Sequence, residues 1–405
     1  MINLTNGGVC APKGFKAGGI HCGIRKNKIK KDIALIVSDV DASAAAVYTT
    51  NLVKGAPLLV TKKHLENGIA KAVICNSGNA NTCNADGIDI AEKMCQLVAD
   101  EMGIKAEDVV VASTGVIGQP LDITPIKDNM KALCQSISYE NGMDAAEAIM
   151  TTDTKVKEIA VEFEIDGKIC KMGGIGKGSG MIHPNMATML IFITTDVNIS
   201  KELLDEALKE DIKDTFNMIS VDGDTSTNDM VTILANGMAE NKIIDKKDEN
   251  FEIFKKALNT ITVAISRMIA GDGEGATKLL ECKVVGAKSK EIAKVVSKSI
   301  ICSSLVKAAM FGSDANWGRV LCAIGYSGAD VDVKKVDVNF ESAKGIIEVC
   351  KNGAGIEFSE EKAKEILLEN EIIINVALND GEGKATAWGC DLTYDYVKIN
   401  GDYRT

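Results

Sequence analysis

The 405-residue sequence has few aromatic residues, only five prolines and no excess of positive charge. Aromatic residues make up 4% of the chain, which argues against a stacking surface for single-stranded nucleic acid. The 46 lysines and arginines are outnumbered by 57 acidic residues, so the net charge is −11. An acidic chain repels a phosphate backbone, and we therefore expect no nucleic-acid partner.

Long apolar runs are also missing. No stretch reaches the roughly 18 apolar residues of a membrane span, and the N-terminal residues have no apolar core of a secretory signal. The 12 cysteines are scattered, without a CxxC pair or a histidine at ligand spacing. We therefore expect a cytoplasmic protein with reduced cysteines, no membrane contact and no metal.

Two polar segments resemble known ligand-binding motifs but lack residues that those motifs require. GGIGKGSG (173–180) resembles a phosphate-binding loop, but Lys171 and Gly178 occupy positions where the Walker A motif needs glycine and serine or threonine. DGDTSTND (222–229) resembles a calcium loop, but Thr227 and Ile233 replace the required glycine and glutamate. Nucleotide binding and metal chemistry are therefore poorly supported.

What is present is an alternation of strand and helix patterns in a chain that is 46% hydrophobic. Residues 33–39, 71–75, 108–114 and 157–165 have the β-branched content of strands. A helix is predicted over 89–103, a second after the N-cap Ser200, and a third after Ser359. Residues 337–341, 345–350 and 371–378 predict a late antiparallel sheet. The order indicates a mixed α/β fold with helices covering sheets.

The segment GGIGKGSGMIHPNMATMLIFITTD (173–196) carries the chemistry. A glycine-rich, conformationally free run leads to Ala187 and Thr188, and a buried strand follows over 189–193. This layout is typical of a self-cleaving N-terminal nucleophile, whose hydroxyl attacks the preceding carbonyl. The freed α-amino group, with a pKa of about 7.7–8.0, would then serve as the base of the same residue. A glycine-rich loop that merely leads into a core strand is the alternative.

Eight segments resemble, in order, the ornithine acetyltransferase family, which comprises the glutamate N-acetyltransferases of cyclic arginine biosynthesis. The longest contains the cleavage signature KGSGMIHPNMATML (177–190). The others are NSGNANTC (76–83), ASTGVIGQPL (112–121), AIMTTDT (148–154), SVDGDTSTND (220–229), IAGDGEGATKL (269–279), LVKAAMFGSDANWGR (305–319) and YVKINGDYRT (396–405).

The resemblance implies an αββα-like sandwich, with helices outside stacked sheets and a smaller C-terminal part. It implies self-cleavage between Ala187 and Thr188 into an alpha chain (1–187) and a beta chain (188–405). It also implies transfer of acetyl from N2-acetyl-L-ornithine to L-glutamate through an acetyl-Thr188 ester. No cofactor is implied, although some members of the family also accept acetyl-CoA. Two copies of each chain are expected to form a heterotetramer.

The same resemblance assigns the site residues. Thr188 matches the nucleophile, and Thr114 and Gly115 match the oxyanion hole. The substrate contacts implied are Thr151, Lys177, Thr188, Glu274, Asn400 and Thr405. Glu274 has a rival in Glu382, because DGEG occurs in both AGDGEGATK (270–278) and LNDGEGKAT (378–386). His183 is expected to be structural, and no role is assigned to Asn76, Ser77, Asn79, Trp317 or Arg319.

Two other functions use the same observations. An aminopeptidase or amidase would employ the same nucleophile, because water competes with glutamate for the ester. A non-enzymatic amino-acid-binding protein would keep an uncut chain. The mass of the protein under denaturing conditions separates the last alternative from the first two.

Overall fold

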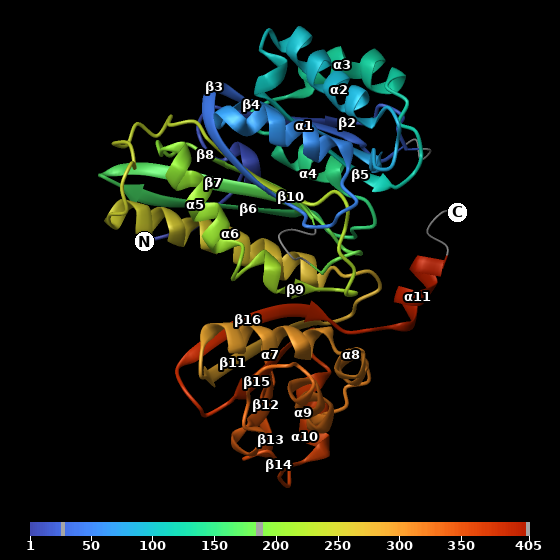
Figure 1. Cartoon of the computed structure of the whole chain (residues 1–405), viewed down its shortest axis with the longest axis vertical. Helices are drawn as coiled ribbons and strands as arrows, with labels where there is room; N and C mark the ends of the chain where they lie inside the picture. Colours follow the sequence, from blue (N-terminus) through green and yellow to red (C-terminus); the bar gives the residue numbers. More distant parts are fainter. Residues whose placement is uncertain (26–28, 184–188, 402–405) are drawn as a thin grey trace. The chain divides into compact units, whose positions relative to one another are not determined.

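A computed structural model gives the structure of the chain and describes residues 1–25, 29–183 and 189–401. The chain divides into two compact units (Figure 1). The large unit contains Met1–Gly178, Asn185–Phe216 and Thr225–Ile265, and the small unit contains Ser179–Pro184, Asn217–Asp224 and Ser266–Thr405. Among the described residues, no helix is long and apolar enough to cross a membrane. The division into 1–187 and 188–405 concerns the covalent chain after cleavage and stays a prediction.

The large unit is built on a sheet that has nine strands in the described residues. These strands are β1 (Asn3–Thr5), β2 (Phe15–Ile20), β3 (Ile33–Tyr48), β4 (Ile69–Asn79), β5 (Val109–Val116), β6 (Lys157–Ile165), β7 (Lys168–Lys177), β8 (Leu190–Thr195) and β10 (Met230–Ala235). They follow the order β1-β6-β7-β8-β10-β3-β4-β5, and β2 pairs with β3. The helices of this part are α1 (Ala56–His64), α2 (Gly87–Met102), α3 (Thr124–Ser136), α4 (Gly142–Ile149), α5 (Lys201–Asp211) and α6 (Glu249–Gly271), whose last turn and a half belong to the small unit.

Strand β3 belongs to two layers. Its residues 33–38 pair with β2 and its residues 43–48 pair with β10. Strand β4 pairs with residues 33–37 and, after a shift of register, with Ala42 and Ser43. Cys75, Ala112 and Phe192 pack together in the core between the layers. The outer faces of β4 and β5 pack against α2 and α3. Helices outside stacked sheets are therefore present, as predicted.

Strand β7 corrects the interpretation of GGIGK (173–177) as a conformationally free run, because these residues are paired with β6 and β8. The glycines have a packing role. A Cβ at Gly174 would lie 3.1 Å from Ile265 and 3.2 Å from Ile261 of α6. Small residues on this face of β7 let the helix approach closely. Alternate residues of β7 face the core, among them Ile175.

The small unit contains a seven-stranded sheet in the described residues, ordered β14-β13-β12-β15-β11-β16-β9. The strands are β9 (Ile219–Ser220), β11 (Leu279–Ala287), β12 (Asp337–Ser342), β13 (Gly345–Lys351), β14 (Ala354–Gly355), β15 (Glu371–Ala377) and β16 (Gly383–Cys390). The helices are α7 (Lys290–Cys302), α8 (Ser304–Phe311), α9 (Trp317–Gly325), α10 (Glu360–Leu367) and α11 (Tyr394–Gly401).

The predicted late antiparallel sheet is correct for β12 with β13 and β15. The same sheet also contains parallel pairs that lie outside that prediction, because β15 runs parallel to β11 and β9 runs parallel to β16. Parallel neighbours need a long crossover, and the chain between β11 and β15 supplies one through α7 to α10. Ser200 and Ser359 cap α5 and α10, as predicted, by accepting hydrogen bonds from Leu203 and Lys362.

Candidate active site

The start of β8 lies between two strands that carry ionisable residues. Leu190 pairs with Lys177 of β7 and with Met230 of β10. The Met230 amide donates to the Met189 carbonyl at 2.8 Å. Ala187 and Thr188 lie outside the described residues, so their assigned roles stay predictions. The strand that follows them is nevertheless fixed, with Lys177 on one side and the residue before Met230, Asp229, on the other.

Thr151 and Lys177 are brought together by a residue that the sequence did not single out, Asp153. One Asp153 oxygen accepts the Thr151 amide at 2.9 Å. The other accepts the Gly178 amide at 2.7 Å and the Lys157 ammonium at 2.7 Å. The side chains of Asp153 and Lys157 are 0% and 1% exposed. Burial opposes ionisation of Asp153, but the charges of Lys177 and Lys157 hold its pKa well below the usual range.

Asp229 is a second buried acid near Lys177, and its pKa moves the other way. Burial raises the pKa of Asp229 well above its ordinary value, opposed by Ser226 and by the charge of Lys177. Within the described part of the chain, its Oδ2 atom has no hydrogen-bond partner. The pKa of Asp153 is therefore lowered, whereas the pKa of Asp229 is raised. The difference is the direct contact of Asp153 with Lys157.

Thr114 and Gly115 lie at the end of β5. Thr114 is 9% exposed and follows Ala112, a residue of the core between the layers, by two positions. Gly115 has φ +133°, and a Cβ there would lie 2.3 Å from the Gly78 carbonyl carbon. Only glycine fits this backbone conformation and this close approach to β4. A threonine hydroxyl beside a backbone N–H is a suitable pair of donors for an oxyanion.

Asn228 fastens the end of β5 to its surroundings. Its Nδ2 atom donates to the carbonyls of Ala80 at 2.6 Å and of Ser113 at 2.9 Å. Its Oδ1 atom accepts from the hydroxyls of Thr82 and Thr227 at 2.5 and 2.6 Å. All four hydrogen-bonding positions of the amide are thus used. The DGDTSTND segment therefore contributes a structural clamp next to Thr114.

The NSGNAN segment has a similar supporting role. Asn76 accepts the Ser113 hydroxyl at 2.6 Å and donates to the Asn79 carbonyl at 3.0 Å. The Ser77 hydroxyl donates to the Ala148 carbonyl at 2.6 Å. Asn79 donates to the Gln119 carbonyl at 3.0 Å. Asn76, Ser77 and Asn79 are all buried, and their contacts shape the ends of β4 and β5.

Lys177 acts on the core side of the sheet. It follows Ile175 by two positions on the inner face of β7. Burial raises the pKa of Cys75 in β4 to about 12, and the charges of Lys177 and Arg25 oppose that rise. Among the described residues, the Lys177 ammonium has no hydrogen bond or ion pair within contact distance. Its positive charge is therefore available to an anionic ligand.

Glu274 and Asn400 meet in the small unit. Asn400 donates to Glu274 Oε2 at 2.8 Å. The Glu274 amide donates to the Ser179 carbonyl at 2.9 Å, and a Cβ at Gly180 would lie 2.3 Å from the Glu274 carboxyl carbon. Glu274 is 8% exposed, whereas Glu382 in the similar turn is exposed. The structure thus groups Thr114, Gly115, Thr151 and Lys177 in the large unit and Glu274 and Asn400 in the small unit, while Thr405 lies outside the described residues.

His183 precedes the predicted cleavage point and contacts Ser220 at 3.1 Å and Cys302 at 3.6 Å. Burial and the charge of Lys298 lower the pKa of His183 to about 4, so its imidazole is neutral at pH 7. Trp317 packs against Gly355, and Arg319 donates to the Leu305 carbonyl at 2.8 Å. These contacts give Trp317 and Arg319 packing roles within the small unit.

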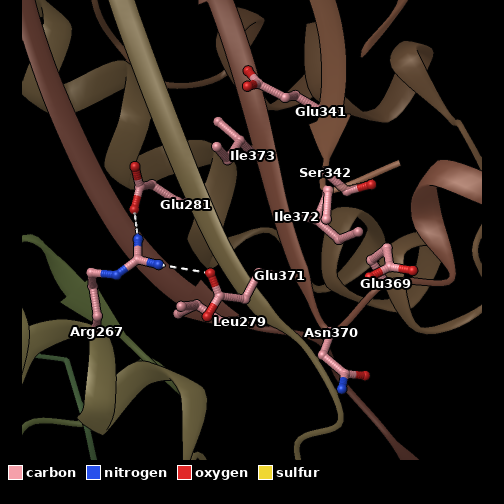
Figure 2. A pocket seen from close by; sticks show the side chains of 11 residues that line it. Arg267, Leu279, Glu281, Glu341, Ser342, Glu369, Asn370, Glu371, Ile372 and Ile373 are labelled. Atoms are coloured by element: carbon pink, nitrogen blue, oxygen red, sulfur yellow. Dashed lines mark hydrogen bonds and ion pairs between the residues drawn. The ribbon is translucent and has the colours of Figure 1, made fainter. Parts of the chain in front are cut away.

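A pocket with a volume of about 450 Å³ lies on the sheet of the small unit (Figure 2). Arg267 crosses one side of it and pairs with Glu281 and Glu371. None of the predicted site residues lines it. In the part of the chain that the structure describes, no group of three histidine, cysteine or acidic side chains is arranged to hold a metal.

Sequence reasoning assigned no role to Asp153, Lys157, Asn228 or Asp229, although all four lie in segments that it quoted. Their contacts join segments distant in the chain, such as Asp153 with Gly178. A usable signal was Lys157, a charged residue at the start of an apolar strand, four positions after an aspartate. Buried charges of this kind are found in pairs.

Comparison with known proteins identifies the family to which this chain belongs. The sequence profile of the ArgJ family matches residues 16–405. The chain belongs to the ArgJ family. This membership confirms the resemblance to the ornithine acetyltransferases that the sequence motifs indicated.

Three relatives are informative. The arginine biosynthesis bifunctional protein ArgJ of Caldanaerobacter subterraneus subsp. tengcongensis is 51% identical over 405 residues, which is 100% of both chains. A crystal structure of ArgJ from Bacillus halodurans is 47% identical, with a TM-score of 0.50, and covers 52% of this chain and 97% of that chain. An ornithine acetyltransferase from Mycobacterium tuberculosis, solved with ornithine, is 34% identical, with a TM-score of 0.43, and covers 46% of this chain and 100% of that chain.

Proposed function

We propose that this ArgJ-family protein is an acetyltransferase of arginine biosynthesis that moves acetyl from N2-acetyl-L-ornithine to L-glutamate. The observation that carries the proposal is the family match over residues 16–405. Relatives that match the full length are named arginine biosynthesis bifunctional proteins. The second activity of a bifunctional enzyme would be direct acetylation of glutamate by acetyl-CoA, with acetyl-CoA as a substrate and no resident cofactor.

The first chemical step is maturation. The Thr188 hydroxyl attacks the carbonyl carbon of Ala187, the C–N bond breaks, and an ester forms with a free α-amino group on Thr188. Water then hydrolyses the ester, leaving a carboxylate on Ala187 and a free hydroxyl on Thr188. Support comes from the Bacillus halodurans chain. The match covers 97% of that chain but only 52% of this one, so that chain has about the length of one predicted fragment.

The second step is transfer. The Thr188 hydroxyl attacks the acetyl carbon, its proton passes through the α-amino group to the leaving amine, and ornithine departs. The glutamate amine then attacks the acetyl ester, which gives N-acetylglutamate and restores the hydroxyl. Thr114 and Gly115 would donate hydrogen bonds to the oxyanion of each tetrahedral intermediate.

Recognition follows from charge. Both substrates carry an α-carboxylate, which Lys177 and Thr151 would bind. The side-chain ammonium of ornithine would pair with Glu274, and Asn400, which already contacts Glu274, would orient it. We place Thr405 at the same site and the enzyme in the cytoplasm, as two alpha and two beta chains.

The test combines mass and activity. The purified protein should give two fragments, 1–187 and 188–405, under denaturing conditions without added protease. Thr188→Ala should give one chain of 405 residues and no acetyl transfer. Efficient cleavage of Thr188→Ala would contradict the mechanism. A cleaved protein that only hydrolyses N-acetylornithine, and makes no N-acetylglutamate, would favour the amidase alternative.

A further inference from the structure

We propose that Asp153, paired with Lys157, is a positioning residue that sets Thr151 and Lys177 to bind the α-carboxylate shared by both substrates. This inference rests on the proposed function, because it concerns how that site is held. Asp153 does not contact the substrate in this scheme. It acts through the two residues that do.

The geometry is a single carboxylate joined to two segments. Thr151 lies in the connection between α4 and β6, and Lys177 is the last residue of β7. Asp153 accepts the backbone N–H of Thr151 and that of Gly178, the residue after Lys177. One side chain therefore fixes the backbone at both of the proposed binding residues. An aspartate that merely closed its own loop would not reach the end of β7.

The charges explain why a lysine is paired with this aspartate. Asp153 lies 2.7 Å from Lys157, and Lys177 acts on it from beyond contact distance. Lys157 therefore neutralises the buried Asp153 carboxylate, and this carboxylate forms no ion pair with Lys177. Burial raises the pKa of Asp229, a second buried acid on which the charge of Lys177 acts, and this favours its neutral form. Because the Asp153 carboxylate contacts Lys157 and not Lys177, the Lys177 ammonium can pair with a monoanionic carboxylate.

The main variant is Asp153→Asn, assayed on the cleaved enzyme with activity normalised to the cleaved fraction. An amide cannot accept two N–H groups and an ammonium as a carboxylate does, so Thr151 and Gly178 lose their common anchor. We expect KM for both N-acetylornithine and glutamate to rise about tenfold or more, because hydrogen bonds to a charged group are lost. The value of kcat should stay within about threefold, because the nucleophile and oxyanion donors are untouched.

Asp196 provides a matched control. It is also buried, at 1% exposure, and accepts two backbone N–H groups, from Lys13 at 3.0 Å and Lys171 at 2.7 Å. Lys171 lies six residues before Lys177 on β7, or about 20 Å along the strand. Asp196→Asn should lower thermal stability and leave KM unchanged. An equal rise in KM in Asp196→Asn and Asp153→Asn would reduce Asp153 to a stabilising residue.

A double-mutant cycle separates this inference from the proposed function. Lys177→Met should raise KM for both substrates, and adding Asp153→Asn to it should raise KM by less than twofold more. If Lys177→Met leaves KM unchanged, the proposed carboxylate site is wrong. If Lys177→Met raises KM and Asp153→Asn does not, the site stands and the positioning role is wrong.

A variant that keeps the charge guards against a failure to fold. Asp153→Glu retains the ion pair with Lys157 but displaces the carboxylate by one methylene. It should fold and cleave, and its KM should rise for both substrates by a similar factor. Unchanged KM values in a folded Asp153→Glu enzyme would overturn the proposal.

Discussion

Glu274 and Glu382 occupy the same four-residue sequence, DGEG, in two turns with different surroundings. Glu274 is buried, anchored through its amide to Ser179 and through its carboxylate to Asn400. Glu382 is exposed in the connection between β15 and β16. A buried carboxylate held by one amide still has acceptor capacity for an ammonium. An exposed one competes with water for every contact.

Replacement of each glutamate by glutamine tests this contrast. Glu274→Gln should lower kcat/KM for N-acetylornithine about 10- to 150-fold, because a hydrogen bond between charged groups in a pocket is lost. Glutamate has no distal cation, so its half-reaction should lose less. Glu382→Gln should change neither value by more than twofold. Measurement of kcat/KM for both substrates in both variants decides between the turns, and a donor-selective loss in Glu382→Gln would reverse the assignment.

At the scale of elements, a backbone conformation and a side-chain contact together fix the end of β5. Gly115 allows a conformation that only glycine adopts, and Asn228 holds the Ser113 carbonyl immediately before Thr114. The backbone on both sides of Thr114 is therefore held in place. A preorganised donor of this kind contributes mainly to the transition state.

Thr114→Ala should lower kcat about 100-fold with little change in KM, because the hydroxyl is needed mainly in the tetrahedral state. Thr114→Ser keeps a hydroxyl at the same position and should retain activity within about tenfold. Steady-state kinetics on the cleaved enzymes give both values. If Thr114→Ala stays within about threefold of the unmodified enzyme, the residue serves only the turn.

Local sequence patterns predicted the helices and strands whose hydrophobic residues follow one regular pattern along the element. β6 spans Lys157–Ile165, as expected, and α2 spans Gly87–Met102 against an expected 89–103. β7 was misread, because Gly174 and Gly176 suggested freedom when they serve the packing of α6. The direction of β15 relative to β11 could not be read either, because it depends on the path of the intervening helices.

The residues of the candidate site also fall into those that the sequence could predict and those that it could not. Thr114, Thr151, Lys177 and Glu274 could be named because family motifs carry them. Asp153 could not be named, because its role depends on a hydrogen bond from the Gly178 amide, 25 residues away in the chain. Asn228 could not be named either, because its partners Ala80 and Ser113 lie more than 100 residues away in the chain. Family motifs therefore predict which residues meet a substrate, whereas the tertiary structure shows which residues hold those predicted residues in place.

For the whole molecule, the predicted cleavage point has a topological consequence. The residues before it supply β7 and β3, and the residues after it supply β8 and β10. β8 pairs with β7 over Met172–Lys177, and β10 pairs with β3 over Ser43–Tyr48. The two strands of the second fragment, β8 and β10, therefore lie side by side between β7 and β3 of the first fragment in one sheet. Their side chains also share one core, in which Phe192 lies among residues of β4 and β5.

We therefore expect fragments 1–187 and 188–405 to stay associated after cleavage. Separating them would break two ladders of strand pairing and expose the core between the layers. Size-exclusion chromatography with light scattering should give one species that contains equal amounts of both fragments, and denaturant should resolve them in a single cooperative transition. Phe192→Ala, at a side chain 1% exposed, should reduce the free energy of unfolding by about 3–5 kcal/mol and shift that transition to lower denaturant. Fragments that elute separately in native buffer would show that the sheet does not hold the two chains together.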